Sequence, residues 1–200
     1  PMLGKELQNI ANNKNVKALI IFVDSHGGTS FGGEFLYRNL RQISTSGKPV
    51  VAVIRTVGTS AGYAVALGAD RIFALETSLI GSIGAIIRSA DLTELLGKIG
   101  IRTEIYRSGK FKSFPSVVET TPEEAEIILQ SAVDNITNWF IRIISQRRKL
   151  SPNDLAKVTN GRIFTGQQAL AAGLIDDIGG EVEAVNWLRK SQGIAPNLPI

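Results

Sequence analysis

Two runs of apolar, mostly β-branched residues lie in the first third of the chain, at residues 18–23 and 50–54. Both runs are continuous rather than alternating, which is typical of parallel strands that helices cover on both faces. Between them, apolar residues follow a helical spacing from Phe31 to Ile43, and Gly47 and Pro49 follow as a stop signal. This strand–helix–strand order predicts a crossover unit in a parallel sheet.

The same alternation continues in the middle of the chain. The patterns predict a helix over 60–68, a strand over 71–75, a helix over 92–98 and a strand over 103–107. We therefore expect an α/β fold of repeated βαβ and ββα units, with a mostly parallel sheet and flanking helices. A chain of 200 residues without linkers or repeats is expected to form one domain over residues 1–200.

The second half is expected to be mostly helical. Thr121 and Pro122 give a start signal, and a wide apolar face follows through about Arg147. Two interpretations of that face remain open, burial inside one domain and contact between subunits. Ser151 and Thr165 are predicted to cap two further short helices, and Gly173 to end the second of them.

The composition excludes several classes of site. The chain has no cysteine, which excludes a disulfide framework and a thiol nucleophile, and one histidine, which excludes a two-histidine metal motif. Its net charge of +4 comes from scattered residues, so we expect no nucleic-acid partner. No apolar run reaches the length of about 18 residues that a membrane span needs. The helix that opens directly after Pro1 suggests that the sequence was trimmed from a longer one.

Three glycine-rich turns follow predicted strands, at residues 24–28, 58–62 and 81–84. In open α/β sheets, ligands bind beyond the carboxyl ends of the strands, so we expect the three turns to be neighbours. Adjacent glycines allow backbone N–H groups to approach a substrate closely, as an oxyanion hole requires. Each turn taken alone could equally be a simple tight turn.

Ser60 is the candidate nucleophile, because residues 58–62 match the G-x-S-x-G pattern of hydrolases with a nucleophile elbow. That class needs a histidine after the serine, and the only histidine, His26, comes before it. A triad of Asp24, His26 and Ser60 remains formally possible. A neutral lysine is the other side chain that could deprotonate a serine hydroxyl.

The position of such a lysine is not fixed by the motif around the serine. The S-x-x-K spacing is absent, because Tyr63 stands where the lysine would be. Lys110 and Lys112 follow a predicted strand and are both candidates. The pattern alone does not choose between them.

Taken together, the motifs resemble the signal peptide peptidase A (SppA) family of serine proteases in the Clp/crotonase superfamily. The resemblance covers nearly the whole chain. It is carried, in order, by residues 24–28 (DSHGG), 59–63 (TSAGY), 68–72 (GADRI), 81–84 (GSIG), 108–113 (SGKFKS), 161–166 (GRIFTG) and 173–176 (GLID).

This resemblance implies a role for individual residues. Ser60 would be the nucleophile, Lys112 rather than Lys110 the general base, and Ser82 a residue that helps to hold the lysine. The oxyanion donors would be the backbone N–H groups of Gly28 and Ala61. The family usually has proline where this chain has His26, and a second glycine or a similar residue where it has Ala61. Both changes leave the backbone donors in place, and the change at His26 puts the shape of the first turn in question.

The resemblance also implies a function and a setting. We expect a serine endopeptidase that uses a Ser–Lys dyad, without cofactor or metal, to degrade cleaved signal peptides and similar apolar peptides. We expect a homo-oligomer whose dyad is shared across a subunit interface. The location would be the bacterial cell envelope, with the catalytic domain outside the cytoplasm and an inner-membrane anchor in a preceding segment.

Three alternatives stay open. A phage-type capsid-maturation protease would use the same dyad on the same fold. An acyl-CoA hydratase or isomerase of the crotonase type would use the oxyanion turns with acidic bases and no nucleophile. A catalytically idle assembly scaffold would keep the fold without activity.

Overall fold

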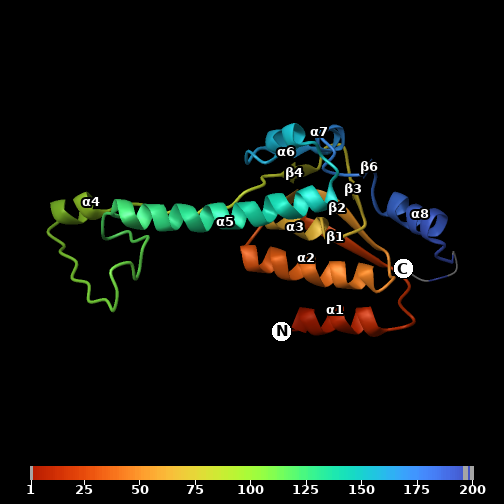
Figure 1. Cartoon of the computed structure of the whole chain (residues 1–200), viewed down its shortest axis with the longest axis horizontal. Helices are drawn as coiled ribbons and strands as arrows, with labels where there is room; N and C mark the ends of the chain where they lie inside the picture. Colours follow the sequence, from red (N-terminus) through yellow and green to blue (C-terminus); the bar gives the residue numbers. More distant parts are fainter. Residues whose placement is uncertain (1, 196–197, 199–200) are drawn as a thin grey trace. The chain divides into compact units, whose positions relative to one another are not determined.

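A computed structural model describes residues 2–195 and residue 198 of the chain (Figure 1). Its elements fall into two compact units, one formed by residues 1–84 and 139–200 and the other by residues 85–138. In chain order the elements are α1 (Met2–Asn12), β1 (Leu19–Ser25), α2 (Ser30–Thr45), β2 (Val50–Thr59), α3 (Ala61–Ala66), β3 (Arg71–Ala74), β4 (Leu79–Gly81), α4 (Thr93–Lys98), α5 (Glu123–Arg147), α6 (Pro152–Val158), β5 (Ile163–Thr165), α7 (Gly166–Ala171), β6 (Asp177–Ile178) and α8 (Glu181–Gln192).

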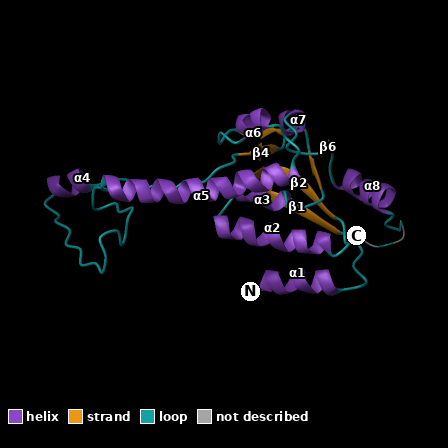
Figure 2. Ribbon diagram, in the orientation of Figure 1, coloured by secondary structure: helices purple, strands orange, loops and turns teal. Residues whose placement is uncertain are grey.

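The strands form one mostly parallel sheet in the first unit (Figure 2). β2 lies at its centre and pairs in parallel with β1, β3 and β4, while β3 pairs in parallel with β6. β4 and β5 are the antiparallel pair. Because β2 pairs with β3 over its first half and with β4 over its end, the strand that precedes Ser60 is held along almost its whole length.

The two faces of β2 are buried against different helices, as its continuous apolar run predicted. Val50, Ala52 and Ile54 belong to the larger core, to which α1, α2, α3 and the end of α5 contribute. Val51 and Val53 face the other way and pack in a smaller core with α8. Figure 1 shows α1, α2 and α3 on one side of the strands. Burial on both faces explains why the run carries no polar residue.

Most predicted elements of the first unit are confirmed, with shifted ends. The helix predicted over 60–68 begins one residue later, and Ser60 is its N-cap. Ser151 caps α6 through a bond from the Asp154 N–H, Thr165 caps α7 in a capping box, and Gly173 follows α7 with φ of 72°.

The second unit contains α4 and the first part of α5 and has little core of its own. Among residues 85–138, Ala125 alone is buried. The strand predicted over 103–107 is wrong, because this exposed segment pairs with no other strand in the described part of the chain. A strand needs a partner edge for its backbone groups, and the residue types of a short segment do not supply one. The assignment of one domain to residues 1–200 stays a prediction.

Candidate active site

Ser60 lies at the junction between β2 and α3, in a backbone conformation that few serines adopt. Its φ is 53° and its ψ is −125°, a combination that costs about 1–3 kcal/mol for a residue with a Cβ. The Ser60 N–H donates to the Gly81 carbonyl at 2.8 Å, and on the other side the buried Tyr63 hydroxyl donates to the Leu174 carbonyl at 2.6 Å. The sharp turn is therefore held from both ends. Burial raises the pKa of the Tyr63 phenol, so this anchor stays protonated.

Gly27 contacts the side chain of Ser60 directly. A Cβ built on Gly27 would lie 2.9 Å from the Ser60 Cβ and 3.2 Å from its Oγ, and the φ of Gly27 is 128°. Both the space and the backbone therefore require glycine at this position. The first and second glycine-rich turns are neighbours, as the sequence predicted.

Of the predicted oxyanion donors, Ala61 follows Ser60 in the chain and Gly28 follows Gly27, the residue that contacts Ser60. Neither backbone N–H donates a hydrogen bond to another described residue, and a Cβ on Gly28 would meet nothing within 4 Å. The Ser60 side chain makes no capping bond to α3 either. The hydroxyl and the two N–H groups are therefore all unengaged, as groups that act in acyl transfer need to be before a substrate binds.

A cleft of about 350 Å³ opens beside this turn, between β1, α2 and α3. Gly27, Gly28 and Ala61 line one end of it, and Phe22, Leu36 and Val65 give it apolar walls. This cleft therefore has room for an apolar side chain next to the residues that carry the predicted donors.

Ser82 follows β4 at the level of Ser60. The register pairs Thr59 with Gly81, so the residues that follow the two strands are adjacent. Ser82 has a φ of 49°, and its N–H donates to the Arg162 carbonyl at 2.8 Å. The third turn thus joins the other two.

The two candidate lysines belong to the second unit and differ in their surroundings. The Lys110 ammonium forms an ion pair with Glu124 at 2.8 Å and lies 5.3 Å from the centre of the Phe111 ring. The hydrogen bond and the charge of Lys110 lower the pKa of the Glu124 carboxyl. Lys112 is exposed, and its ammonium has no hydrogen-bond partner among the described residues. Ser60 belongs to the first unit, so the dyad of Ser60 and Lys112 stays a prediction.

Asp24 and His26 have structural roles that do not form a triad. The Asp24 carboxylate accepts from the Val57 N–H at 3.2 Å and from the Thr56 hydroxyl at 3.4 Å, where β1 and β2 change register. The His26 carbonyl accepts from the Thr59 hydroxyl at 2.9 Å. Among the described residues there is no group of three acidic or histidine side chains that could hold a metal.

Two features of the site were missed from the sequence. The sequence did not predict that Asp24 accepts a hydrogen bond from β2. This bond depends on the irregular register between β1 and β2, which the order of apolar and polar residues does not indicate. The contact between Gly27 and Ser60 was signalled by the paired glycines, but the pattern did not say which of the two needs to be glycine.

Comparisons with known proteins find a peptidase family and several relatives. The sequence matches peptidase family S49 over residues 42–195. It is 35% identical over 184 residues to a Synechocystis protein named as a protease, slr0021, covering 92% of this chain and 66% of the relative. It is 30% identical over 187 residues to an Enterococcus faecium protein named for signal peptide peptidase SppA, covering 94% and 54%. The chain thus spans between about half and two thirds of the length of these relatives.

The fold has a counterpart among solved structures. A mutant of ClpP1 from Listeria monocytogenes matches 92% of this chain and 88% of its own, with a TM-score of 0.56 and 14% sequence identity. This likeness confirms the Clp-type fold. In the described residues, no helix is both long and apolar enough to cross a membrane. By the match of its sequence, the chain belongs to peptidase family S49.

Proposed function

We propose that the chain is a serine endopeptidase in which Ser60 attacks the scissile carbonyl and Lys112 accepts its proton. The observation that carries the proposal is the turn around Ser60, where an unbonded hydroxyl in a constrained backbone packs against Gly27 and the N–H groups of Gly28 and Ala61 are unengaged. Membership of a peptidase family supports the same chemistry.

The steps follow from these groups. The neutral Lys112 amine takes the Ser60 proton as Oγ bonds to the carbonyl carbon, and the oxyanion accepts from the N–H groups of Gly28 and Ala61. Lys112 then gives the proton to the leaving amine as the peptide bond breaks, leaving an acyl-enzyme. Water, activated by the same amine, releases the second product. Ser82 would help to hold the lysine.

The choice of Lys112 over Lys110 has support in the second unit. The Lys110 ammonium is already engaged by the Glu124 carboxylate at 2.8 Å, on the surface of this unit. The Lys112 ammonium has no such acidic partner in the described part of the chain. We propose that a neighbouring subunit completes its surroundings.

Exposed apolar side chains support a homo-oligomer. Of the 21 large apolar residues that are exposed in the described part of the chain, 12 belong to residues 85–138, among them Tyr106 at 91% and Ile127 at 63%. Within the second unit (residues 85–138) only one residue, Ala125, is buried. Large exposed apolar patches are characteristic of surfaces that contact another protein. We propose that another subunit covers this unit and that the dyad forms across the interface.

The substrates we propose are cleaved signal peptides and similar apolar segments in the bacterial cell envelope. The apolar walls of the cleft beside Ser60, Phe22, Leu36 and Val65, suit small apolar side chains. The name of the Enterococcus faecium relative fits such substrates. Anchoring to the membrane through a preceding segment is part of the proposal.

Hydrolysis of a fluorogenic apolar peptide tests the proposal. Ser60→Ala and Lys112→Ala should each lower kcat by at least about a thousandfold without changing the oligomeric state. Lys110→Ala is the matched control, because it removes a lysine two positions away, and it should retain most of the activity. Full activity in Lys112→Ala together with loss in Lys110→Ala would assign the base to the other lysine.

A further inference from the structure

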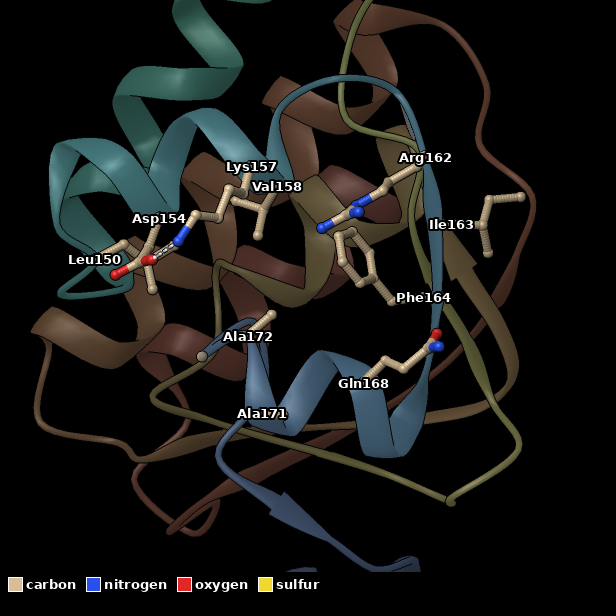
Figure 3. Close-up of a pocket in the computed structure, with 11 residues that line it drawn as sticks. Leu150, Asp154, Lys157, Val158, Arg162, Ile163, Phe164, Gln168, Ala171 and Ala172 are labelled. Atoms are coloured by element: carbon tan, nitrogen blue, oxygen red, sulfur yellow. Dashed lines mark hydrogen bonds and ion pairs between the residues drawn. The ribbon is translucent and has the colours of Figure 1, made fainter.

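A second and larger cleft lies in the first unit, and no residue of the three glycine-rich turns is among those that line it. Its volume is about 640 Å³, within the range that small ligands and short peptides occupy. It is formed by α6, β5, α7 and the residues next to them (Figure 3). Leu150, Val158 and Phe164 give it an apolar floor, and polar side chains lie around them.

Arg162 gives this cleft an unbalanced positive charge. Its guanidinium lies 4.7 Å from the centre of the Phe164 ring and points into the space between β5 and α6 (Figure 3). It forms no ion pair with any residue that the structure describes. The other charges in the lining, Asp154 and Lys157, pair with each other at 2.8 Å. The cleft therefore has one cation to offer to an anion.

Gln168 adds a second free donor to the lining. Its side-chain Oε1 accepts from the Thr165 N–H at 2.9 Å in the capping box of α7, which leaves its amide Nε2 without a partner among the described residues. A guanidinium and an amide N–H lining one apolar space suit a carboxylate followed by a carbonyl oxygen.

The backbone and the apolar floor of this cleft are held in place by contacts within the fold. The Arg162 carbonyl accepts from the Ser82 N–H at 2.8 Å, and β5 pairs with β4. Val158 and Phe164 are 2% and 5% exposed, so the apolar floor belongs to the core. A ligand would therefore lose little free energy in ordering the backbone and the floor of the cleft.

We propose that this cleft binds the C-terminal carboxylate of an apolar peptide, with the carboxylate on Arg162 and apolar side chains against Leu150, Val158 and Phe164. One unpaired cation matches a singly charged carboxylate better than a phosphate. The peptide bond next to the carboxylate gives the Gln168 amide an acceptor that a fatty acid lacks. The identity of the natural occupant rests on the proposed function, because peptide hydrolysis generates such carboxylates at each cut.

Binding to the full chain with Ser60→Ala tests the proposal, because this background keeps the peptide intact. The probe is a fluorescent pentapeptide of alanine and leucine, with a free C-terminal carboxylate or a C-terminal amide. The amide should bind at least about tenfold more weakly, and Arg162→Gln should weaken the free acid to the same extent. Arg142→Gln, at an exposed arginine on α5, is the matched control and should leave binding unchanged.

The outcomes separate this proposal from the proposed function. The proposal is overturned if the peptide acid and the peptide amide bind equally well. It is also overturned if Arg162→Gln leaves binding unchanged in a variant whose melting temperature equals that of the Ser60→Ala background. Octanoate that competes as well as the free peptide would overturn the assignment to a peptide. Arg162→Lys should recover part of the affinity, because it restores the charge without the planar fork. None of these results depends on hydrolysis by Ser60.

Discussion

At the scale of single residues, the site depends on close packing around Ser60. The serine is held in an unfavourable backbone conformation by a bond to Gly81 on one side and by the start of α3 on the other. The backbone of Gly27 packs so closely against the Ser60 Cβ that no side chain fits at position 27. Strain of this kind persists only where neighbouring structure over-determines it, so small additions nearby should move the hydroxyl.

Gly27→Ala should lower kcat/KM by at least about a hundredfold and destabilise the fold by about 1–3 kcal/mol. The added methyl would lie 2.9 Å from the Ser60 Cβ, at a φ of 128° that alanine rarely adopts. Peptide hydrolysis and urea unfolding measure the two effects.

Gly28→Ala is the control for this substitution, because the added methyl meets nothing within 4 Å. It should change the free energy of unfolding by less than about 1 kcal/mol. Equal stability losses in the two variants would show that packing against Ser60 is not what position 27 requires.

At the scale of elements, Asp70, which directly precedes β3, connects this strand to α2 and to the start of β2. Its carboxylate accepts from Arg41 at 2.8 Å and Ser44 at 2.6 Å, both on α2, and from the Val50 N–H at the start of β2 at 2.9 Å. Burial raises the pKa of this carboxyl, but the hydrogen bonds from Ser44, Val50 and Arg41 outweigh that effect and lower the pKa below its usual value. The folded state therefore favours the ionised form.

The stability that Asp70 contributes should be present at neutral pH and disappear in acid. A lowered pKa in the folded state means that the contribution is complete above the unfolded pKa of about 4 and is lost as the pH falls through the folded value. Asp70→Asn should cost about 2 kcal/mol at pH 7, since its side chain is 27% exposed and well bonded. Urea unfolding at pH 7 and pH 3 measures this.

The variant should differ less from the wild type at pH 3 than at pH 7. The same difference at both values would mean that the amide disturbs packing rather than charge. Lys157→Gln, at an exposed ion pair on α6, is a suitable comparison and should change stability little at either pH.

The elements that the sequence predicted correctly are those whose signal is local. The caps Ser151 and Thr165 and the glycine at 173 act through neighbours in the chain, and β1 and β2 are marked by continuous apolar runs. The segment 103–107 was predicted wrongly because a strand depends on a partner elsewhere. The same reason hid the bond from Val57 to Asp24, which needs two strands in a particular register.

At the scale of the whole molecule, the sequence predicted the half of the site that lies on the sheet. The three glycine-rich turns meet because parallel strands end at one edge, and this follows from the strand order alone. The lysine is different, because it lies in a unit with almost no core, whose apolar residues are exposed in a single chain. The environment of Lys112 is therefore expected to be a property of the assembly.

Complementation between two inactive variants tests this expectation. If Ser60 of one subunit works with Lys112 of another, then Ser60→Ala and Lys112→Ala, each inactive alone, should form active sites when they are refolded together. With random mixing of equal amounts in a symmetric ring, about one quarter of the sites would pair an intact serine with an intact lysine. The matched control mixes Lys112→Ala with the double variant, where no such pair exists. Mixed oligomers that show no activity above this control would place the dyad within one subunit.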